Sequence, residues 1–272
     1  MVENQYGKTS SLILNVISKD DRTYLNHAEF TAPFKVLNPF YIRKDECELM
    51  QLMLISVSAG LMAGDVQDIS IQTRPGSLSE FTTQSYEKIH KMPAGQAIRN
   101  THLLIGSHSF CHYKPLPMIP FAESSFASET TVELEDDSSV LVYREVLSGG
   151  RQAYSENFAY KSFRNKVTIR MQGHLLYYDN TIMEPQVMDM SGYGMWEGYT
   201  HMGNLIFCNL PFESERVKEI RQLFADEKIC GGISQMDGAL VLVRIFGMRA
   251  DEIIRCFDKI YEGTKIGIRS TG

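Results

Sequence analysis

The sequence predicts a mainly β protein that ends in a small α-β-β-α portion, and three observations support this fold class. Short stretches of alternating apolar and polar residues recur from Ser11 to about Leu210, as is typical of strands. Turns rich in Pro, Gly, Asn and Asp separate these stretches. Beyond them, apolar residues recur at steps of three and four, which indicates helices. No linker divides the chain, so we expect one domain (1–272), with a β-rich body (1–210) and a C-terminal portion (211–272) packed on it.

The clearest predicted strands lie in the body. VQDISIQT (66–73), TTVELE (130–135) and VTIRMQ (167–172) alternate with a period of two and are rich in β-branched side chains. Turn signals include RPGS (74–77) and EDDSS (135–139). These residues predict a long succession of hairpins.

The C-terminal portion is predicted to hold two helices around a hairpin. The first helix has Ser214 as its expected N-cap and an apolar face made of Val217, Ile220, Leu223 and Phe224. The second ends before Gly263 and repeats apolar residues at Ala250, Ile253, Ile254, Phe257, Ile260 and Tyr261. Between them, Asp237-Gly238 separates two apolar strands, which is a strong hairpin signal.

Composition excludes several classes of protein. With 43% hydrophobic and 22% charged residues, the chain is typical of a folded protein. Its formal charge of −6 gives no global positive field, so we expect no nucleic-acid partner. The longest mostly apolar run, Glu48–Asp65, is too short to span a membrane. The N-terminus does not match a secretory signal and the five cysteines form no C-x-x-C pair, so we expect a cytoplasmic protein.

The stretch SAGLMAGDVQD (58–68) is the first candidate for a ligand-binding loop. A phosphate-binding loop needs Lys after its last Gly, whereas here Asp65 follows Gly64 and would repel phosphate. The stretch also lacks the alternating oxygen ligands of a calcium loop. A tight strand-turn-strand corner, with Gly60 and Gly64 at backbone angles that favour glycine, is the simpler interpretation.

The cluster HSFCHY (108–113) offers three metal-ligand types. On a strand, His108 and His112 would share a face but lie about 13 Å apart, too far to share one ion, while Cys111 would face the other way. The simpler interpretation is side chains at the edge of the core or in solvent, so no preformed metal site is predicted. No G-x-S-x-G or H-E-x-x-H motif is present, and the residues alone give little support for an enzyme.

Two polar stretches have an ordinary structural interpretation as well as a functional one. TTQSYEKIH (82–90) has the composition of a solvated sheet face, and YREVLSGGR (143–151) that of a surface ion pair beside a Gly turn. Taken in order, however, these stretches resemble the UreD family of urease accessory proteins, called UreH in some systems. GLMAGD (60–65) matches a Gly-rich turn that ends in Gly-Asp, and PLPMIPF (115–121) matches Pro-x-Pro-x-Ile-Pro-Phe. Further matching positions are Thr83, Gln84, Lys88, Glu145, Gly150, Arg151 and Glu156.

The resemblance spans roughly Thr31 to Tyr199 and implies a non-enzymatic scaffold that helps to load nickel into apo-urease. It implies a long, coiled, β-helix-like and mostly antiparallel structure with two helices. Partners would be UreF, the GTPase UreG through UreF, and the urease apoprotein, with a dimer of UreF-bound heterodimers as the assembly. An internal tunnel would carry Ni²⁺ in transit, with no permanently bound cofactor.

The resemblance also implies which residues serve that path. Asp65 is expected to line it, followed by Glu145 and then Glu156, because isolated carboxylates bind nickel weakly enough to release it. His108, Cys111 and His112 fall outside the family pattern. The remaining motif positions would shape the turn (Gly60, Gly64) or supply polar groups (Thr83, Gln84, Lys88, Arg151).

Two alternatives remain open at this point. One is a β-barrel metal-dependent enzyme that uses His108 and His112, which would hold a stoichiometric metal through dialysis. The other is a β protein that binds a small molecule without UreF or urease.

Overall fold

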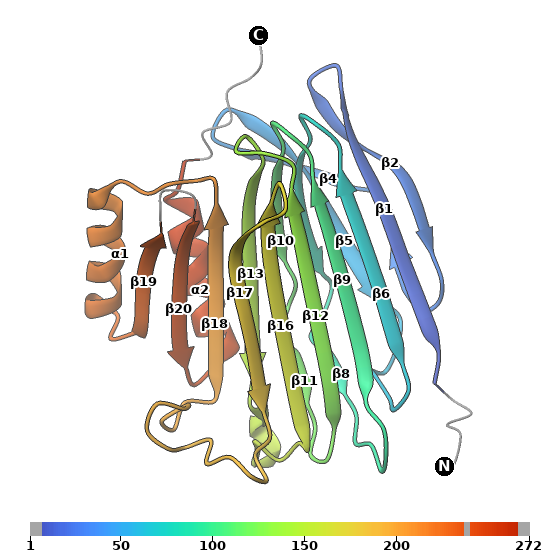
Figure 1. Ribbon diagram of the computed structural model, residues 1–272, viewed down its shortest axis with the longest axis vertical. Helices are drawn as coiled ribbons and strands as arrows, with labels where there is room; N and C mark the ends of the chain where they lie inside the picture. The colour runs from blue at the N-terminus through green and yellow to red at the C-terminus, as the bar shows by residue number, and fades with distance from the viewer. Residues whose placement is uncertain (1–6, 237–239, 266–272) are drawn as a thin grey trace.

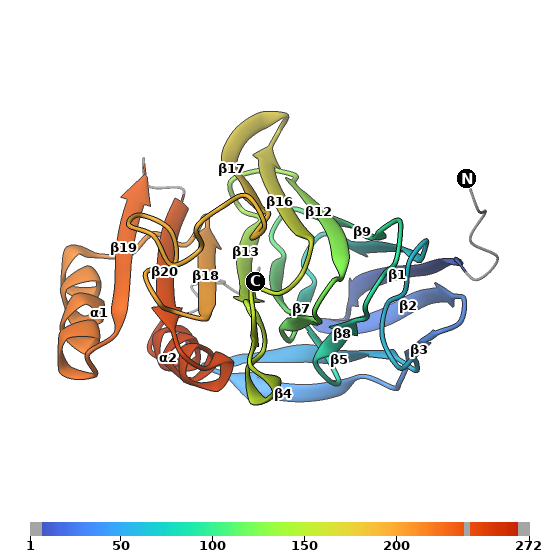
Figure 2. The same cartoon turned by 90° about the horizontal axis from the view of Figure 1, so that it is seen from below.

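The computed structural model describes residues 7–236 and 240–265, and most of its strands form two β-sheets that pack face to face. Figures 1 and 2 show the sheets from two directions, with both helices beside the last strands of the chain. Sheet A has seven strands in the order β17-β16-β12-β9-β6-β1-β2. Their bounds are β1 Thr9–Lys19, β2 Arg22–Phe30, β6 Val66–Thr73, β9 Ala97–Ile105, β12 Ser125–Leu134, β16 Ser162–Met171 and β17 His174–Met183.

Sheet B has eleven strands, with a main path in the order β19-β20-β18-β13-β10-β7-β5-β3. Strand β4 pairs with β5, and β11 pairs with β13 and β8. The bounds are β3 Phe34–Val36, β4 Phe40–Lys44, β5 Cys47–Ser56, β7 Leu78–Thr83, β8 Glu87–Ile89, β10 Phe110–Lys114, β11 Met118–Pro120, β13 Val140–Ser148, β18 His201–Cys208, β19 Cys230–Met236 and β20 Leu240–Gly247. A separate ribbon of β14 (Gly150–Arg151) and β15 (Glu156–Asn157) flanks the 3-10 helix η1 (Gln152–Tyr154).

Consecutive long strands of the body alternate between the two sheets. Strand β5 lies in sheet B, β6 in sheet A, β7 in sheet B and β9 in sheet A. Strands that become neighbours are therefore far apart in sequence and pair in parallel, as where Val66 of β6 lies opposite Ile98 of β9. The chain winds as a coil that adds one strand to each sheet per turn.

The predicted mainly β class with two helices is confirmed, but the expected pairing is wrong for these coils. A hairpin needs consecutive strands side by side in one sheet, whereas here each connection crosses to the other sheet, and this favours parallel neighbours. Antiparallel pairs do occur at the ends of the sheets, at β1 with β2, β16 with β17, and β18 with β20.

The C-terminal portion continues sheet B. Strands β20 and β19 extend it beyond β18, and the helices are α1 (Ser214–Asp226) and α2 (Ala250–Glu262), so the predicted α-β-β-α order is confirmed. Helix α1 begins at Ser214 with Glu213 in the N-cap position, which corrects the predicted cap by one residue. Gly263 follows α2 as predicted. The predicted Asp237-Gly238 turn lies outside the described residues.

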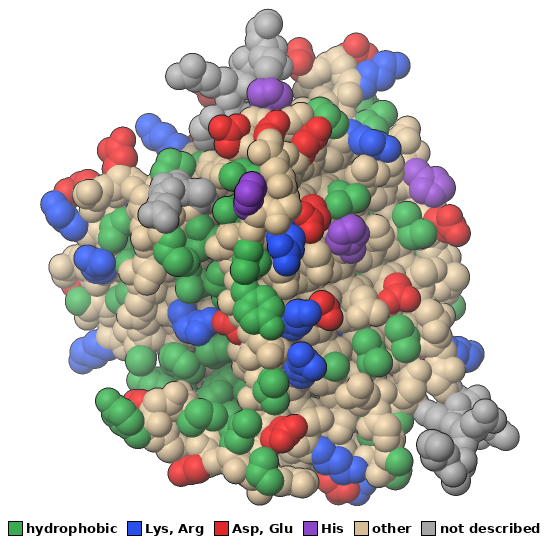
Figure 3. All heavy atoms as spheres, in the orientation of Figure 1, with side chains coloured by type: hydrophobic (Ala, Val, Ile, Leu, Met, Phe, Trp, Pro, Cys, Tyr) green, Lys and Arg blue, Asp and Glu red, His purple; other side chains and the backbone are tan. Residues whose placement is uncertain are grey.

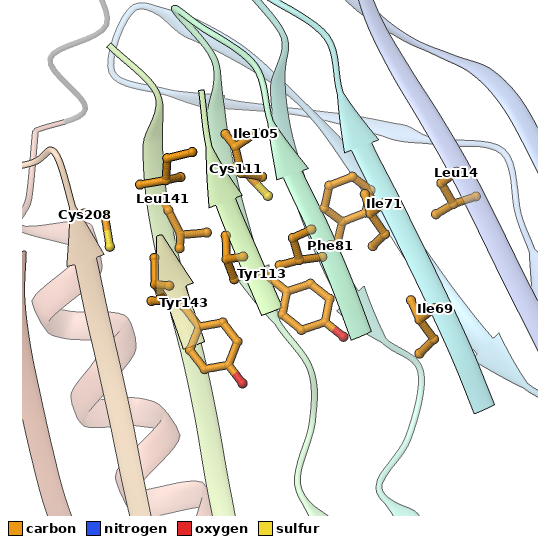
Figure 4. Packing of buried hydrophobic residues seen from close by; sticks show 14 of the residues in the cluster. Leu14, Ile69, Ile71, Phe81, Ile105, Cys111, Tyr113, Leu141, Tyr143 and Cys208 are labelled. Atoms are coloured by element: carbon orange, nitrogen blue, oxygen red, sulfur yellow. The ribbon is translucent and has the colours of Figure 1, made fainter. Parts of the chain in front are cut away.

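Alternation along the strands fills the space between the sheets with apolar side chains. Leu14 and Ile71 of sheet A meet Phe81 and Cys111 of sheet B in one buried cluster (Figure 4). Full burial of one such side chain contributes about 1.5–3 kcal/mol, so this cluster is a main source of stability.

Helix α2 covers the outer face of sheet B, where it packs on β13, β18 and β20. Its apolar face contacts β18 at Gly203, where an added Cβ would lie 2.4 Å from Cγ2 of Ile253 and 2.7 Å from the Phe257 ring. The side chains of Ile253 and Phe257 are both buried, so neither can move away from an added methyl group. A glycine at this position therefore sets the distance between helix and sheet.

A buried polar group lies under the C-terminal end of α2. Nδ1 of His112 on β10 donates a hydrogen bond to Oε2 of Glu80 on β7 at 2.9 Å, and Lys114 pairs with the same carboxylate at 2.6 Å. The His112 ring packs against Tyr261 of α2, with 4.2 Å between ring centroids. Burial lowers the pKa of His112 to about 4, although its bond to Glu80 acts in the opposite direction. The imidazole is therefore neutral at pH 7.

The surface and helices add two observations. On the face in Figure 3, Lys and Arg side chains lie interspersed with Asp and Glu side chains, and no single sign of charge covers it. Within residues 7–236 and 240–265, neither helix has the length and apolar character needed to cross a membrane.

The Gly203→Ala variant should be less stable than wild type by about 1–3 kcal/mol, because the new methyl group forces Ile253 and Phe257 apart. Urea unfolding of both proteins measures the difference. Gly232→Ala is the matched control, since a Cβ there meets nothing within 4 Å. An unchanged midpoint for Gly203→Ala would show that α2 does not pack this closely on β18.

Stability should fall as the pH is lowered from 6.5 to 4.5, because unfolding lets His112 take up a proton that its folded site disfavours. Burial acts to raise the pKa of Glu80, but His112 and Lys114 together outweigh it and lower this pKa to about 2. The stability that the Glu80 carboxylate contributes is therefore lost only below its ordinary pKa of 4.5. Urea titrations at several pH values should show a shallower slope in this window for His112→Gln. Equal slopes in the two proteins would contradict a neutral, buried His112.

Candidate functional site

The space between the sheets changes from apolar to polar along its length. The phenol groups of Tyr113 and Tyr143 mark the change, because their rings stack within the apolar cluster and their oxygens point out of it in the same direction (Figure 4). Beyond them lies an inner cavity of about 40 Å³, whose lining includes Glu145, Asn165 and Arg99. Polar groups from both sheets therefore meet inside the molecule.

Glu145 is the centre of this polar region. It is buried on β13 and accepts hydrogen bonds from Nδ2 of Asn204 at 2.7 Å and from Nδ2 of Asn165 at 2.9 Å. The hydroxyl of Tyr143 donates a third bond at 3.1 Å. Asn165 lies on β16 of sheet A, so this carboxylate links the two sheets.

Burial and hydrogen bonding act on Glu145 in opposite directions. Burial raises the pKa of this carboxyl above its ordinary value and the nearby Asp179 acts in the same direction, while the bonds from Asn204, Asn165 and Tyr143 limit the shift. A carboxylate held in this way gains free energy from any cation that approaches it.

The polar row continues from Glu145 to the open edge of the two sheets. Oδ1 of Asn204 accepts a bond from Nε of Arg244 on β20 at 2.7 Å, and Arg244 pairs through Nη2 with Asp179 on β17. Thr181 and Tyr177 also donate to Asp179, at 2.8 and 3.3 Å. The row therefore connects a buried carboxylate with the molecular surface.

A second, wider cavity of about 210 Å³ adjoins the inner one, and the two share Arg99 and Tyr113 as lining residues. Several positions of the sequence motifs line this outer cavity, namely Gly60, Thr83, Gln84 and Lys88. Gly60 has φ of 142°, and a Cβ there would lie 2.4 Å from the carbonyl oxygen of Lys88. Glycine is thus required where this wall of the cavity turns.

Arg99 lines both cavities. Its side chain is 12% exposed and pairs with Glu87, and its Nε donates to Oε1 of Gln67 at 2.9 Å. The guanidinium therefore has both a carboxylate and an amide as partners inside the molecule.

Asp65 directly precedes β6, and its carboxylate accepts bonds from backbone N–H groups. Its Oδ2 accepts the backbone N–H of Met62 at 2.7 Å and its Oδ1 that of Lys8 at 3.4 Å, and it lines neither cavity. Gly64 beside it has φ of 84°. The carboxylate thus stabilises the turn that carries Gly60 to the outer cavity.

Glu156 likewise stabilises a local turn. Its Oε2 accepts bonds from Nε of Arg151 at 2.8 Å and from the N–H of Ala122 at 3.0 Å. The bond from Arg151 lowers the pKa of Glu156 below its ordinary value. The Arg151 guanidinium also stacks 3.9 Å above the ring of Phe121, in the Pro-rich motif.

The three residues of the HSFCHY cluster do not converge. His108 lies in the turn before β10 with φ of 52°, so it shares no strand face with His112 and this part of the expectation is corrected. Cys111 faces the space between the sheets, where burial raises its pKa to about 12. His112 faces α2 on the other side of sheet B.

The polar region around Glu145 also contains residues that the sequence reasoning missed, namely Arg99, Asn165, Asp179, Asn204 and Arg244. A signal was present in two of the strands. Asn204 is the single amide within HMGNLIFC, and Arg244 the single charge within LVLVRIFG. An amide or a charge among the apolar residues of a buried strand indicates a buried hydrogen-bond partner.

Chemically, the row offers oxygen ligands without a closed metal cage. Within the described part of the chain, no three His, Cys, Asp or Glu side chains lie together as a metal site would require. Carboxylate and amide oxygens lie one after another from Asp179 to Glu145 instead. Such a row suits weak, successive contacts with a cation better than permanent binding.

Comparison with known proteins identifies the family of this chain. The family model described as UreD urease accessory protein matches residues 8–267. The urease accessory protein UreH of Helicobacter pylori (strain G27) is 36% identical over 258 residues, which cover 94% of this chain and 95% of that protein. The urease accessory protein UreD of Acetivibrio thermocellus is 33% identical over 253 residues, which cover 93% and 95% of the two chains. The chain therefore belongs to the UreD family of urease accessory proteins.

Proposed function

We propose that this chain is a non-enzymatic scaffold of urease maturation that passes nickel between its two sheets toward the urease apoprotein. The observation that carries the proposal is Glu145, a buried carboxylate whose cavity adjoins a wider one lined by residues of the family motifs. Burial of a carboxylate costs free energy even when hydrogen-bond donors surround it, and this cost is understandable if Glu145 serves a cation in transit.

Nickel fits the ligands of this row. Nickel suits imidazole, carboxylate and water ligands, and a path must bind the ion weakly enough to release it, which oxygen ligands without an imidazole favour. The row from Asp179 to Glu145 supplies such oxygens one at a time. Nickel is here the cargo, and no permanently bound cofactor is part of the proposal.

Within this proposal the three candidate carboxylates have different roles. Glu145 contacts the ion, because it alone among the three lines a cavity described above. Asp65 and Glu156 act indirectly by fixing backbone turns through bonds to Met62 and Ala122. The order of importance thus differs from the one expected from sequence.

The partners in the proposal follow from family membership. UreF would bind this chain directly, UreG would join through UreF and supply GTP hydrolysis, and the urease apoprotein would receive the nickel. We propose the cytoplasm as the compartment and a dimer of UreF-bound heterodimers as the assembly.

The proposal is tested by activation of purified apo-urease with nickel, GTP, UreF and UreG, with and without this chain. Urease activity that depends on the chain, together with a complex with UreF on a sizing column, supports the maturation role. Equal activation in its absence, without a UreF complex, contradicts it.

In the same assay, Glu145→Gln should lower the rate of activation by about tenfold, because the neutral amide keeps the shape of the site but loses its charge. The complex with UreF should persist. Glu129→Gln is the matched control, since Glu129 lies on the outer face of β12 and pairs with Lys166. Full activity of Glu145→Gln would exclude this carboxylate from the path.

A further inference from the structure

Arg244 occupies a position between acidic groups that is unusual for a path proposed to carry cations. It donates from Nε to Asn204 and from Nη2 to Asp179, and Asn204 in turn donates to Glu145. One guanidinium thus lies among the oxygen atoms of a carboxylate and an amide, with a second carboxylate one bond further on.

This arrangement lies at the open edge of the sandwich. Asp179 belongs to β17, the edge strand of sheet A, whereas Arg244 belongs to β20 of sheet B, so their ion pair spans the two sheets. The side chains are 16% and 37% exposed, respectively. Solvent, and an ion dissolved in it, can therefore reach this pair without unfolding of the interior.

Arg99 repeats the pattern on the other side of Glu145. It is also held by one carboxylate, Glu87, and by one amide, Gln67. Glu145 is thus bracketed by two guanidinium groups, each with its own acidic partner. Arg244 is the more exposed of the two and is the one linked to Glu145 through Asn204.

Electrostatics predicts what such an arginine does to a divalent cation. Both species seek the same carboxylate and amide oxygens, and they repel each other at short range. A guanidinium that is already bound must be displaced before a metal ion can take those oxygens. Its presence weakens metal binding and shortens the time that an ion remains.

We propose that Arg244 is a built-in competitor of the metal ion, which prevents the oxygens of Asp179 and Asn204, next to Glu145, from retaining a divalent cation. The proposal rests on the proposed function, in which nickel passes between the sheets. It assigns Arg244 the role of holding the oxygens of Asp179 and Asn204 and of promoting release of the metal ion. Neither the cavities nor the sequence motifs indicate this role by themselves.

The test is titration of the purified full-length chain with NiCl₂ by calorimetry at pH 7. Arg244→Gln should bind Ni²⁺ at least about tenfold more tightly than wild type, because the competing charge is gone. Arg244→Lys keeps the charge and should bind as wild type does. Adding Asp179→Asn to Arg244→Gln should abolish the gain.

Arg164→Gln is the matched control, because Arg164 lies on β16 and bonds outward to Asn180, away from the row. It should leave nickel affinity unchanged. Equal affinity of Arg244→Gln and wild type, a gain that survives Asp179→Asn, or an equal gain in Arg164→Gln would each overturn the proposal.

Two further measurements distinguish a misfolded variant, a failure of the proposed function and a failure of the role of Arg244. Circular dichroism and a urea midpoint confirm that each variant is folded. Arg244→Lys, which keeps the charge, tests the competition even if Arg244→Gln is unstable. A nickel affinity of Arg244→Lys that differs from that of wild type would contradict the proposal. Activation of apo-urease by the wild-type chain tests the proposed function by itself. Failure there overturns the maturation role, whereas the order of nickel affinities decides the role of Arg244.

Discussion

The burial of Glu145 between two sheets is the constraint on which the interior of this protein depends. A carboxylate removed from water is strongly destabilising unless donors surround it, and its donors here come from β13, β16 and β18. Both sheets must therefore keep their register around this one side chain. The same requirement brings Asn204, Arg244 and Asp179 into a connected row, and thus links the middle of the sandwich to its edge.

The coiled winding of the chain makes this arrangement attainable. Each turn places one strand in sheet A and one in sheet B, so residues far apart in sequence, such as Glu145 and Asn204, meet across or along the sheets. Helix α2 closes the outer face of sheet B and leaves the inner face free for polar groups. Sheet A covers the inner face of β13 and β18 and α2 covers their outer face, which explains why neither strand carries an exposed residue.

The fold class could be predicted from sequence because alternation and helical spacing are local properties. The strand at 66–73 and the helix that ends before Gly263 were both found in this way. Parallel pairing could not be predicted from the sequence, because alternation along a strand does not indicate which distant strand lies beside it. The site shows the same limit. Glu145 was identified through the family resemblance. Its hydrogen-bond partners Asn165 and Asn204 come from other strands, and only the fold brings them together.

The most direct test of a path between the sheets is to locate the ion itself. Crystals of the chain in complex with UreF, soaked in nickel, would be measured above and below the nickel absorption edge. The account predicts an anomalous peak between sheets A and B, within bonding distance of Glu145 or of the row that leads to Asp179. Nickel found only on outer surfaces of the complex, with the inter-sheet space empty, would contradict it.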